Sequence, residues 1–282
     1  MKVIRARVLG FCMGVRRAVE MAWRESGQKD MVYTLGPLIH NPGVLKSLEE
    51  RGIRVLSDDC VVPEKSTVII RAHGVSPALE AALRQQGARV LDATCPHVKV
   101  SQMKARSFAE RGYRVFLAGE ENHGEIAGLR GYVNSCYVVG NPEEAEKAAG
   151  ELLRLDGIAK TVLIGQTTIS PAEFRSIGQK LRQFFPGLEI EDTICSATAD
   201  RQEALRELCG EAEAVIIAGG RLSANTRRLL SLAEELGKPA WLVERAEELP
   251  EEIKSYKTVG LSAGASTPDS LIEEIERALK AL

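Results

Sequence analysis

Short apolar runs alternate with amphipathic stretches along the whole chain. The apolar runs are rich in Val, Ile and Leu and cover residues 32–36, 66–74, 88–95, 113–119, 161–168, 214–220, 239–244 and 258–264. The amphipathic stretches carry apolar residues every three or four positions and cover residues 14–26, 42–52, 76–87, 100–112, 142–153, 170–185, 199–210, 225–237 and 268–282. This alternation is typical of α/β layers, so we predict an α/β fold with mainly parallel strands.

The charge balance and the apolar pattern exclude several classes of protein. The 282 residues contain 37 Lys and Arg against 39 Asp and Glu, and this net charge of -2 lacks the basic excess of nucleic-acid binders. No run of 18 apolar residues occurs, and the first 23 residues lack the apolar segment of a signal peptide. We therefore predict a soluble, cytoplasmic protein with no nucleic-acid and no membrane partner.

Six cysteines are spread along the chain without any CxxC pair, at Cys12, Cys60, Cys95, Cys136, Cys195 and Cys209. A chain of this length does not need disulfides for stability, so we expect reduced thiols, some of them metal or cluster ligands. Cys12, Cys95 and Cys195 each lie where a strand passes into a helix, in GFCMGV, DATCPHV and TICSAT. Catalytic groups of α/β proteins collect in such loops.

Three thiolates hold a 4Fe-4S cluster with one iron left open for a substrate oxygen, which makes that iron a Lewis acid. The spacings of 83 and 100 residues are unlike the compact CxxCxxC runs of dedicated cluster proteins, so buried packing cysteines are the alternative. Cys136 and Cys209 lie in strand-like and helical patterns, and we assign both to packing. Cys60 lacks the loop context.

Histidines and hydroxyl residues gather in the same kind of loop. His40, His73 and His123 stand in GPLIHNPG, RAHGVS and NHGEIAG, where Glu125 follows His123 by two residues. Hydroxyl and amide residues precede helices in GQTTIS, GGRLSANT and GASTPD. Helix starts with hydroxyls and imidazoles bind phosphate groups, although helix capping alone would explain each motif taken singly.

Taken together, GFCMGV, GPLIHN, AHGV, DATCP, HGE, QTT, ICSAT with RQEA, SAN and GASTP resemble the LytB family of 4-hydroxy-3-methylbut-2-enyl diphosphate reductases. The resemblance runs from Cys12 to Pro268 in the family's order. It implies three small α/β lobes in a pseudo-threefold cloverleaf around one 4Fe-4S cluster on Cys12, Cys95 and Cys195. A cluster that loses its open iron would appear as 3Fe-4S.

The resemblance also implies the reaction and the roles of single residues. The allylic hydroxyl leaves as water after two electrons and protons arrive, and isopentenyl and dimethylallyl diphosphate form. The residues that match diphosphate-binding positions are His40, His73, His123, Ser223, Asn225 and Ser266. Thr167 matches a substrate-contacting hydroxyl, Thr226 is a further substrate-binding candidate, and Glu125 matches the proton-delivering carboxylate, with His123 able to relay or orient the proton.

The positions of the cysteines further predict the domain borders. We expect lobes at residues 13–95, 96–193 and 194–282, with residues 1–12 leading in and supplying Cys12. The sequence contains no nicotinamide or flavin fingerprint, so electrons come from an external carrier such as ferredoxin or flavodoxin, as the resemblance suggests. We expect a monomer or a weak homodimer.

Two departures from the family pattern keep rival hypotheses open. Gly124 replaces the usual Pro of His-Pro-Glu, and Ala224 replaces one Ser of Ser-Ser-Asn-Ser, which removes a phosphate-facing hydroxyl. One rival is a related cluster enzyme that acts on a different allylic diphosphate. The other is a non-catalytic protein whose cysteines hold structural zinc or a redox-sensing cluster, although structural zinc sites are generally closed and four-coordinate.

Overall fold

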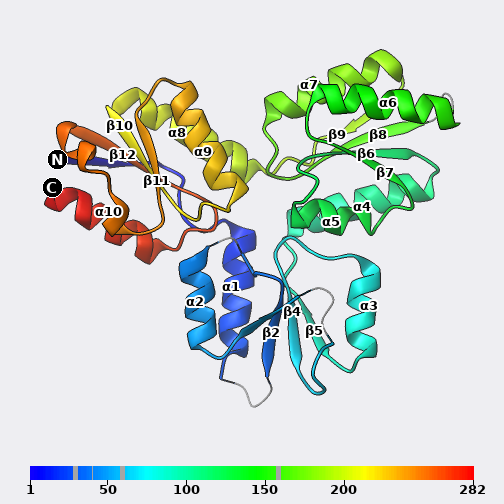
Figure 1. The fold of residues 1–282 in the computed structure, drawn as a ribbon, viewed down its shortest axis with the longest axis horizontal. Helices are drawn as coiled ribbons and strands as arrows, with labels where there is room; N and C mark the ends of the chain where they lie inside the picture. Colours follow the sequence, from blue (N-terminus) through cyan, green and yellow to red (C-terminus); the bar gives the residue numbers. More distant parts are fainter. Residues whose placement is uncertain (28–30, 40, 58–60, 157–159) are drawn as a thin grey trace. The chain divides into compact units, whose positions relative to one another are not determined.

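A computed structural model describes residues 1–27, 31–39, 41–57, 61–156 and 160–282, so His40 and Cys60 lie outside the described residues. In the described part of the chain, twelve strands form three parallel sheets of four strands each, which confirms the predicted α/β fold (Figure 1). The chain divides into two compact units. The first comprises Met1–Ser26, Pro37–Gly52 and Ser196–Leu282, and the second comprises Gly27–Gly36 and Ile53–Cys195.

The sheet of the first unit joins the two ends of the chain. Its strand order is β1 (Lys2–Arg5), β12 (Thr258–Ala263), β10 (Ala214–Ala218) and β11 (Ala240–Val243). Strand β1 pairs with β12 in parallel, with Lys2 opposite Thr258. The unit also contains α1 (Met13–Glu25), α2 (Pro42–Glu50), α8 (Ser196–Glu211), α9 (Ala224–Glu235), α10 (Asp269–Ala281) and the 3-10 turns η1 (Ala246–Glu248) and η2 (Glu251–Ser255).

The central strand β10 explains how this sheet is covered. All five of its residues are buried, and successive side chains point to opposite faces. Ile216 packs in a core with α10, whereas Val215 and Ile217 pack in a second core with α8 and α9. A continuous apolar run therefore forms a strand with helices on both faces, as parallel sheets require.

Two further sheets lie in the second unit. One has the order β3 (Arg54–Leu56), β2 (Val32–Leu35), β4 (Thr67–Ile70) and β5 (Arg89–Asp92). The other has the order β7 (Cys136–Val139), β6 (Arg114–Ala118), β8 (Thr161–Gly165) and β9 (Glu189–Glu191). The helices of this unit are α3 (Pro77–Gln85), α4 (Pro96–Glu110), α5 (Gly124–Arg130), α6 (Pro142–Asp156) and α7 (Pro171–Phe184).

Helices cover both faces of the β6–β9 sheet. Phe116 and Leu163 pack with α6 and α7, whereas Val115 and Leu117 pack with α4 and α5. The α3 helix packs on the sheet of β2 to β5 through Leu83. Counted from β11, the sheet of the first unit has the same relative strand order as the other two sheets. The fourth strand is then β1 in the first unit, and it is β5 and β9 in the two sheets of the second unit.

All eight predicted strands and all nine predicted helices are present, with shifted ends. The strands β1, β3 and β9 and the helix α5 were not predicted as elements, because they have three to seven residues and too few apolar positions for a clear period. The strand β7 was recognised only as a strand-like pattern around Cys136. Cys136 lies on β7 and Cys209 is buried on α8, as their assignment to packing requires. The domain borders at residues 95 and 193 stay predictions.

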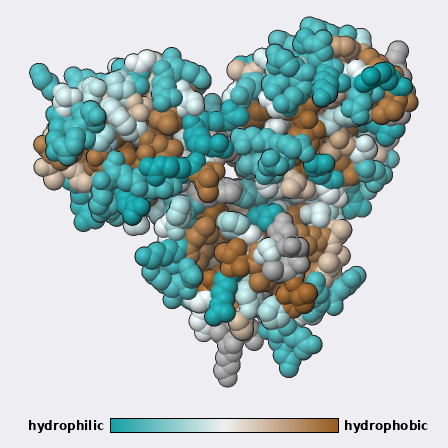
Figure 2. Space-filling view, in the orientation of Figure 1, coloured by the Kyte–Doolittle hydropathy of each residue, from teal (hydrophilic) through white to brown (hydrophobic). Residues whose placement is uncertain are grey.

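Hydrophilic residues cover most of the face shown in Figure 2. Among the described residues, no helix combines the length and the apolar character needed to cross a membrane.

Candidate functional site

The three predicted ligand cysteines share one local structure. Each follows the fourth strand of its sheet and directly precedes a helix: Cys12 before α1, Cys95 before α4 and Cys195 before α8. Each backbone N–H donates to a carbonyl in a neighbouring strand-end loop, Cys12 to Ala265 (3.0 Å), Cys95 to Ala72 (2.9 Å) and Cys195 to Thr167 (2.9 Å). The accepting loops are those that carry Ser266, His73 and Thr167, so each cysteine is fixed to a predicted substrate-binding loop.

An aspartate three residues earlier shapes two of these cysteine loops. Asp92 accepts the N–H of Thr94 at 2.9 Å, and Asp192 accepts the N–H of Ile194 at 3.1 Å. These turns bring the chain from the strand into the cysteine position. The repeated pattern D-x-x-C was present in the sequence and would have revealed the relation between Cys95 and Cys195.

At Cys12, a glycine and a buried arginine fix the loop that precedes the cysteine. Gly10 has φ +80°, and a methyl group there would lie 2.7 Å from Asp269 Oδ1. Its carbonyl accepts a 2.7 Å hydrogen bond from Arg201, which is 3% exposed and also donates to Ala197. Sequence analysis gave Arg201 no role, although RQEA was part of the resemblance.

The three thiols have the chemistry that an iron-sulfur cluster requires. All three are half-buried and free of disulfides, and neither Cys12 nor Cys95 caps its helix by a side-chain hydrogen bond. The positive end of a helix suits a negatively charged thiolate ligand. Among the described residues, no three His, Cys, Asp or Glu side chains are grouped so as to hold a metal ion. The shared role of Cys12, Cys95 and Cys195 as cluster ligands therefore stays a prediction.

Glu125 is a buried carboxyl group that accepts two hydrogen bonds from one threonine. It is the second residue of α5 and is 1% exposed. Thr167 donates its N–H to Oε1 at 2.8 Å and its hydroxyl to Oε2 at 2.7 Å. Burial raises the pKa of Glu125 to about 7, because the loss of solvation outweighs the two hydrogen bonds, which act to lower it. A carboxyl group with this pKa is suited to donate a proton near neutral pH.

Thr167 connects this acid to a ligand cysteine. Its N–H and hydroxyl bind Glu125, while its carbonyl accepts the N–H of Cys195. The acid and the thiol are thus both held by one residue at the carboxyl end of β8. Glu125 and the predicted ligand Cys195 therefore share one anchoring residue within the second unit.

Two histidines lie next to this acid. His123 is the N-cap of α5, and its Nδ1 accepts the N–H of Glu125 at 3.2 Å. In the neutral ring the proton is therefore on Nε2, which makes that nitrogen a hydrogen-bond donor. The rings of His73 and His123 meet edge to face with centroids 5.2 Å apart. The second unit therefore brings together four predicted site residues: His73, His123, Glu125 and Thr167.

The first unit brings together the predicted hydroxyl and amide residues. Ser223 is the N-cap of α9, and its hydroxyl accepts the N–H of Thr226 at 3.4 Å. Asn225 Nδ2 and Thr226 Oγ1 are buried and have no hydrogen-bond partner among the described residues. Buried polar groups without partners are costly, so an anionic ligand that accepts from Asn225 would relieve this cost.

Two glycines keep this region close-packed. A methyl group on Gly264 would collide with the hydroxyl of Thr226, and one on Gly219 would lie 2.6 Å from Thr267 Oγ1. Thr267 donates to the carbonyl of Ala218 at 2.9 Å, which fixes the loop that carries the 5% exposed Ser266. Thr226 thus packs on the strand ends, and its part in substrate binding stays a prediction.

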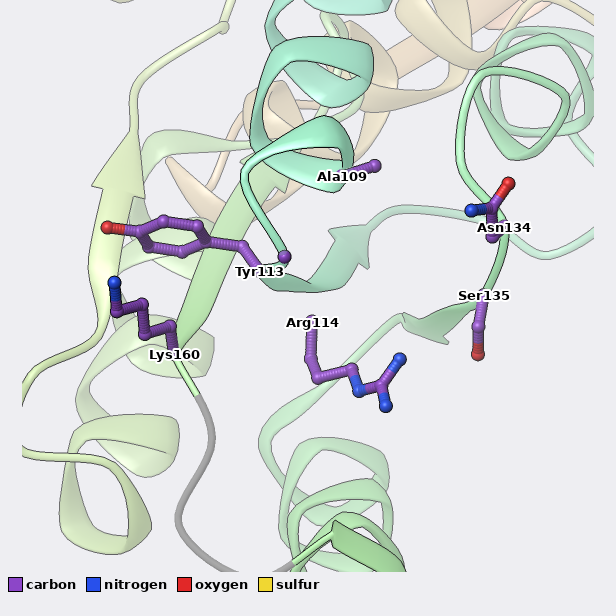
Figure 3. Close-up of a pocket in the computed structure, with 7 residues that line it drawn as sticks. Ala109, Tyr113, Arg114, Asn134, Ser135 and Lys160 are labelled. Atoms are coloured by element: carbon purple, nitrogen blue, oxygen red, sulfur yellow. The ribbon is translucent and has the colours of Figure 1, made fainter.

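A pocket of about 470 Å³ lies at the other edge of the β6–β9 sheet (Figure 3). Its lining includes Arg114, Ser135 and Lys160, which precede or begin strands, whereas Glu125 and Thr167 follow strands. The Tyr113 ring extends toward the Lys160 ammonium, 5.9 Å from the ring centroid. This pocket contains none of the predicted site residues, so we do not assign the reaction to it.

Comparison with known proteins gives one consistent result. The family profile described as LytB protein matches residues 3–280. The chain is 44% identical to a protein of Treponema denticola named 4-hydroxy-3-methylbut-2-enyl diphosphate reductase, with 99% of each chain covered. It is 41% identical to a protein of the same name from Aquifex aeolicus, with 97% of this chain and 94% of that one covered.

Two solved structures match the fold. The structure of E-1-hydroxy-2-methyl-but-2-enyl-4-diphosphate reductase from Plasmodium falciparum superimposes with a TM-score of 0.91 at 29% identity, covering 98% of this chain and 87% of that one. A structure described as (E)-4-hydroxy-3-methyl-but-2-enyl diphosphate reductase, the terminal enzyme of the non-mevalonate pathway, gives a TM-score of 0.74 at 38% identity, with both chains fully covered.

Proposed function

This chain belongs to the LytB protein family, and we propose that it reduces 4-hydroxy-3-methylbut-2-enyl diphosphate to isopentenyl and dimethylallyl diphosphate. The observation that carries the proposal is the buried Glu125, whose pKa is raised to about 7 and which Thr167 joins to Cys195. The reaction replaces the allylic C–O bond by a C–H bond. It consumes two electrons and two protons and releases water.

We propose that Cys12, Cys95 and Cys195 hold one 4Fe-4S cluster. Bound there, the cluster supplies electrons and an open iron that acts as a Lewis acid toward the allylic hydroxyl. The donor set supports this, because the three thiols lie in equivalent loops at helix starts.

Proton delivery falls to Glu125. The leaving hydroxyl needs a proton to depart as water, and a carboxylic acid with a pKa of about 7 is half protonated at neutral pH. Thr167 orients the carboxyl group through both oxygens. The adjacent His123, whose Nδ1 accepts the N–H of Glu125, orients the start of α5 and is our candidate to relay or orient the proton.

The remaining predicted residues bind the diphosphate. Imidazole, hydroxyl and amide donors from His40, His73, His123, Ser223, Asn225, Thr226 and Ser266 would face its oxygens, with Thr167 contacting the organic part. The unpartnered Asn225 Nδ2 supports this assignment. We further propose a ferredoxin or a flavodoxin as the electron donor, a cytoplasmic location, and a monomer or weak homodimer as the state of the protein.

Anaerobic purification tests the proposal. We expect about four irons and four sulfides per chain, and conversion of the hydroxylated C5 diphosphate when a chemical reductant supplies the electrons. One zinc per chain without sulfide would support the structural-metal rival instead. Faster turnover of a different allylic diphosphate would support the rival enzyme that Gly124 and Ala224 suggested.

A further inference from the structure

Arg71 lies among the loops of the second unit that carry predicted site residues. It directly follows β4 and precedes His73 by two residues. Its Nη1 donates a 3.2 Å hydrogen bond to the carbonyl of Leu35, the last residue of β2. The side chain therefore links the carboxyl ends of two neighbouring strands of one sheet.

The backbone at Gly36 leaves room for this guanidinium group. Gly36 has φ +67°, a conformation that favours glycine, and its N–H donates to Leu56 at 2.7 Å. A methyl group on Gly36 would collide with Nη1 of Arg71. Gly36 thus satisfies two requirements, a left-handed backbone and room for the arginine fork.

The other side of the guanidinium group faces the start of α5. A methyl group on Gly124 would lie 3.5 Å from Arg71 Nε and 3.5 Å from His73 Cβ. Gly124 is the residue between His123 and Glu125, and the His73 and His123 rings are in contact. One side chain therefore borders the ends of β2 and β4 and the first residue of α5.

We propose that Arg71 is a positioning residue that clamps these three segments and thereby sets the geometry with which His73 and His123 bind the diphosphate. This inference rests on the proposed function, because it assigns a role in binding that substrate. A planar fork bonds in two directions at once, whereas a lysine ammonium acts as a point charge on a flexible stem. The clamp therefore needs arginine and not simply a positive charge.

The acid has an anchor of its own, so the loss of Arg71 separates binding from chemistry. Glu125 is held by two hydrogen bonds from Thr167, and neither involves Arg71. We expect Arg71→Lys and Arg71→Gln both to raise KM about tenfold, which is the effect of one lost hydrogen bond to a charged group. The fall in kcat should be much smaller, because Glu125 keeps its own anchor although His123 also takes part in the proposed proton transfer. The inhibition constant of inorganic pyrophosphate should rise by the same factor.

Steady-state assays of the cluster-loaded enzyme and its variants under anaerobic conditions test the proposed role of Arg71. If Arg71→Lys restores the wild-type KM while Arg71→Gln does not, only charge matters and the clamp is refuted. If both variants keep the wild-type KM and lose only cluster content or thermal stability, the role is merely structural and the proposal is equally wrong. Arg84→Lys on α3 is the matched control, because the exposed side chain of Arg84 pairs with Glu80 at 2.8 Å and, among the described residues, with no predicted site residue.

A second variant displaces the clamp without removing it. Gly36→Ala should raise KM as Arg71→Lys does, and the double variant should be no worse than either single one. Gly87→Ala is the control for backbone strain, since Gly87 has φ +83° with no atom within 4 Å of an added methyl group. A KM that rises equally in Gly87→Ala would refute the coupling. Wild-type enzyme without reductase activity would refute the proposed function itself, independently of these comparisons.

Discussion

Glu125→Gln tests the proton donor most directly. A group with a pKa of about 7 is protonated in roughly nine tenths of molecules at pH 6 and in about one tenth at pH 8. If protonated Glu125 delivers the proton, wild-type kcat should fall about tenfold for each pH unit above 8 and level off below 6. Glu125→Gln should lower kcat by roughly 100-fold or more and abolish this limb of the profile, because the amide cannot donate an acidic proton.

The same carboxyl group makes stability depend on pH. Burial raises its pKa from the ordinary 4.5 to about 7 in the folded chain, so the ionised form is disfavoured by roughly 3 kcal/mol. Because the folded pKa is raised, this contribution is fully present below pH 4.5 and is lost as pH rises through 7. Glu125→Gln removes this pH-dependent loss of stability. The unfolding temperature of the variant relative to that of the wild type should therefore rise by several degrees between pH 5 and pH 8.5.

The assays use enzyme with equal iron and sulfide content and saturating substrate from pH 5.5 to 8.5, beside thermal unfolding at the same pH values. Iron content in Glu125→Gln should match the wild type, because no cysteine is changed. A wild-type kcat that rises with pH, or a variant that keeps the wild-type turnover, would remove Glu125 from the role of acid. An unfolding temperature difference that does not vary with pH would contradict the raised pKa.

Three further substitutions test other parts of the site. Cys95→Ser should abolish cluster retention and activity together, which iron analysis and a turnover assay would measure. An active Cys95→Ser protein would contradict the assignment of Cys95 as a cluster ligand. Gly124→Pro should stabilise the protein by about 0.4–1 kcal/mol with kcat unchanged, since position 124 opens α5, His123 already has φ -77° and ψ 136°, and an added carbon meets neighbours only at 3.5 Å. Lower thermal stability of that variant would contradict the reasoning. Ala224→Ser should lower KM about tenfold by restoring a hydroxyl bond to the charged diphosphate, and an unchanged KM would indicate that Thr226 already compensates.

The alternation of apolar and amphipathic stretches was sufficient to predict the α/β fold. Buried runs such as AVIIA have a composition that only a covered parallel strand explains. Short elements were not predicted, because tertiary packing determines their conformation more than their own sequence does. In β9, for example, Glu189 and Glu191 flank a single apolar residue, Ile190.

The cysteine and histidine positions were readable because loops at strand ends carry the chemistry of such folds. The family resemblance supplied Glu125, but its raised pKa depends on a burial of 99% that no sequence pattern contains. The roles of Arg71 and Arg201 were not predicted for a similar reason. An arginine is usually exposed, and only the contacts with Leu35 and Gly10 reveal that these two shape the loops.

The first strand of the chain has a consequence for protein synthesis. The ribosome makes residues 2–5 first, yet their partners in β12 are the last strand of the sequence to be made. The hydrogen bond from the N–H of Cys12 to the carbonyl of Ala265 likewise cannot form before Ala265 has been synthesised. The loop of Cys12 therefore reaches its final geometry only after Ala265 has been synthesised, so the cluster that we propose at Cys12 would form on a chain that already contains β12.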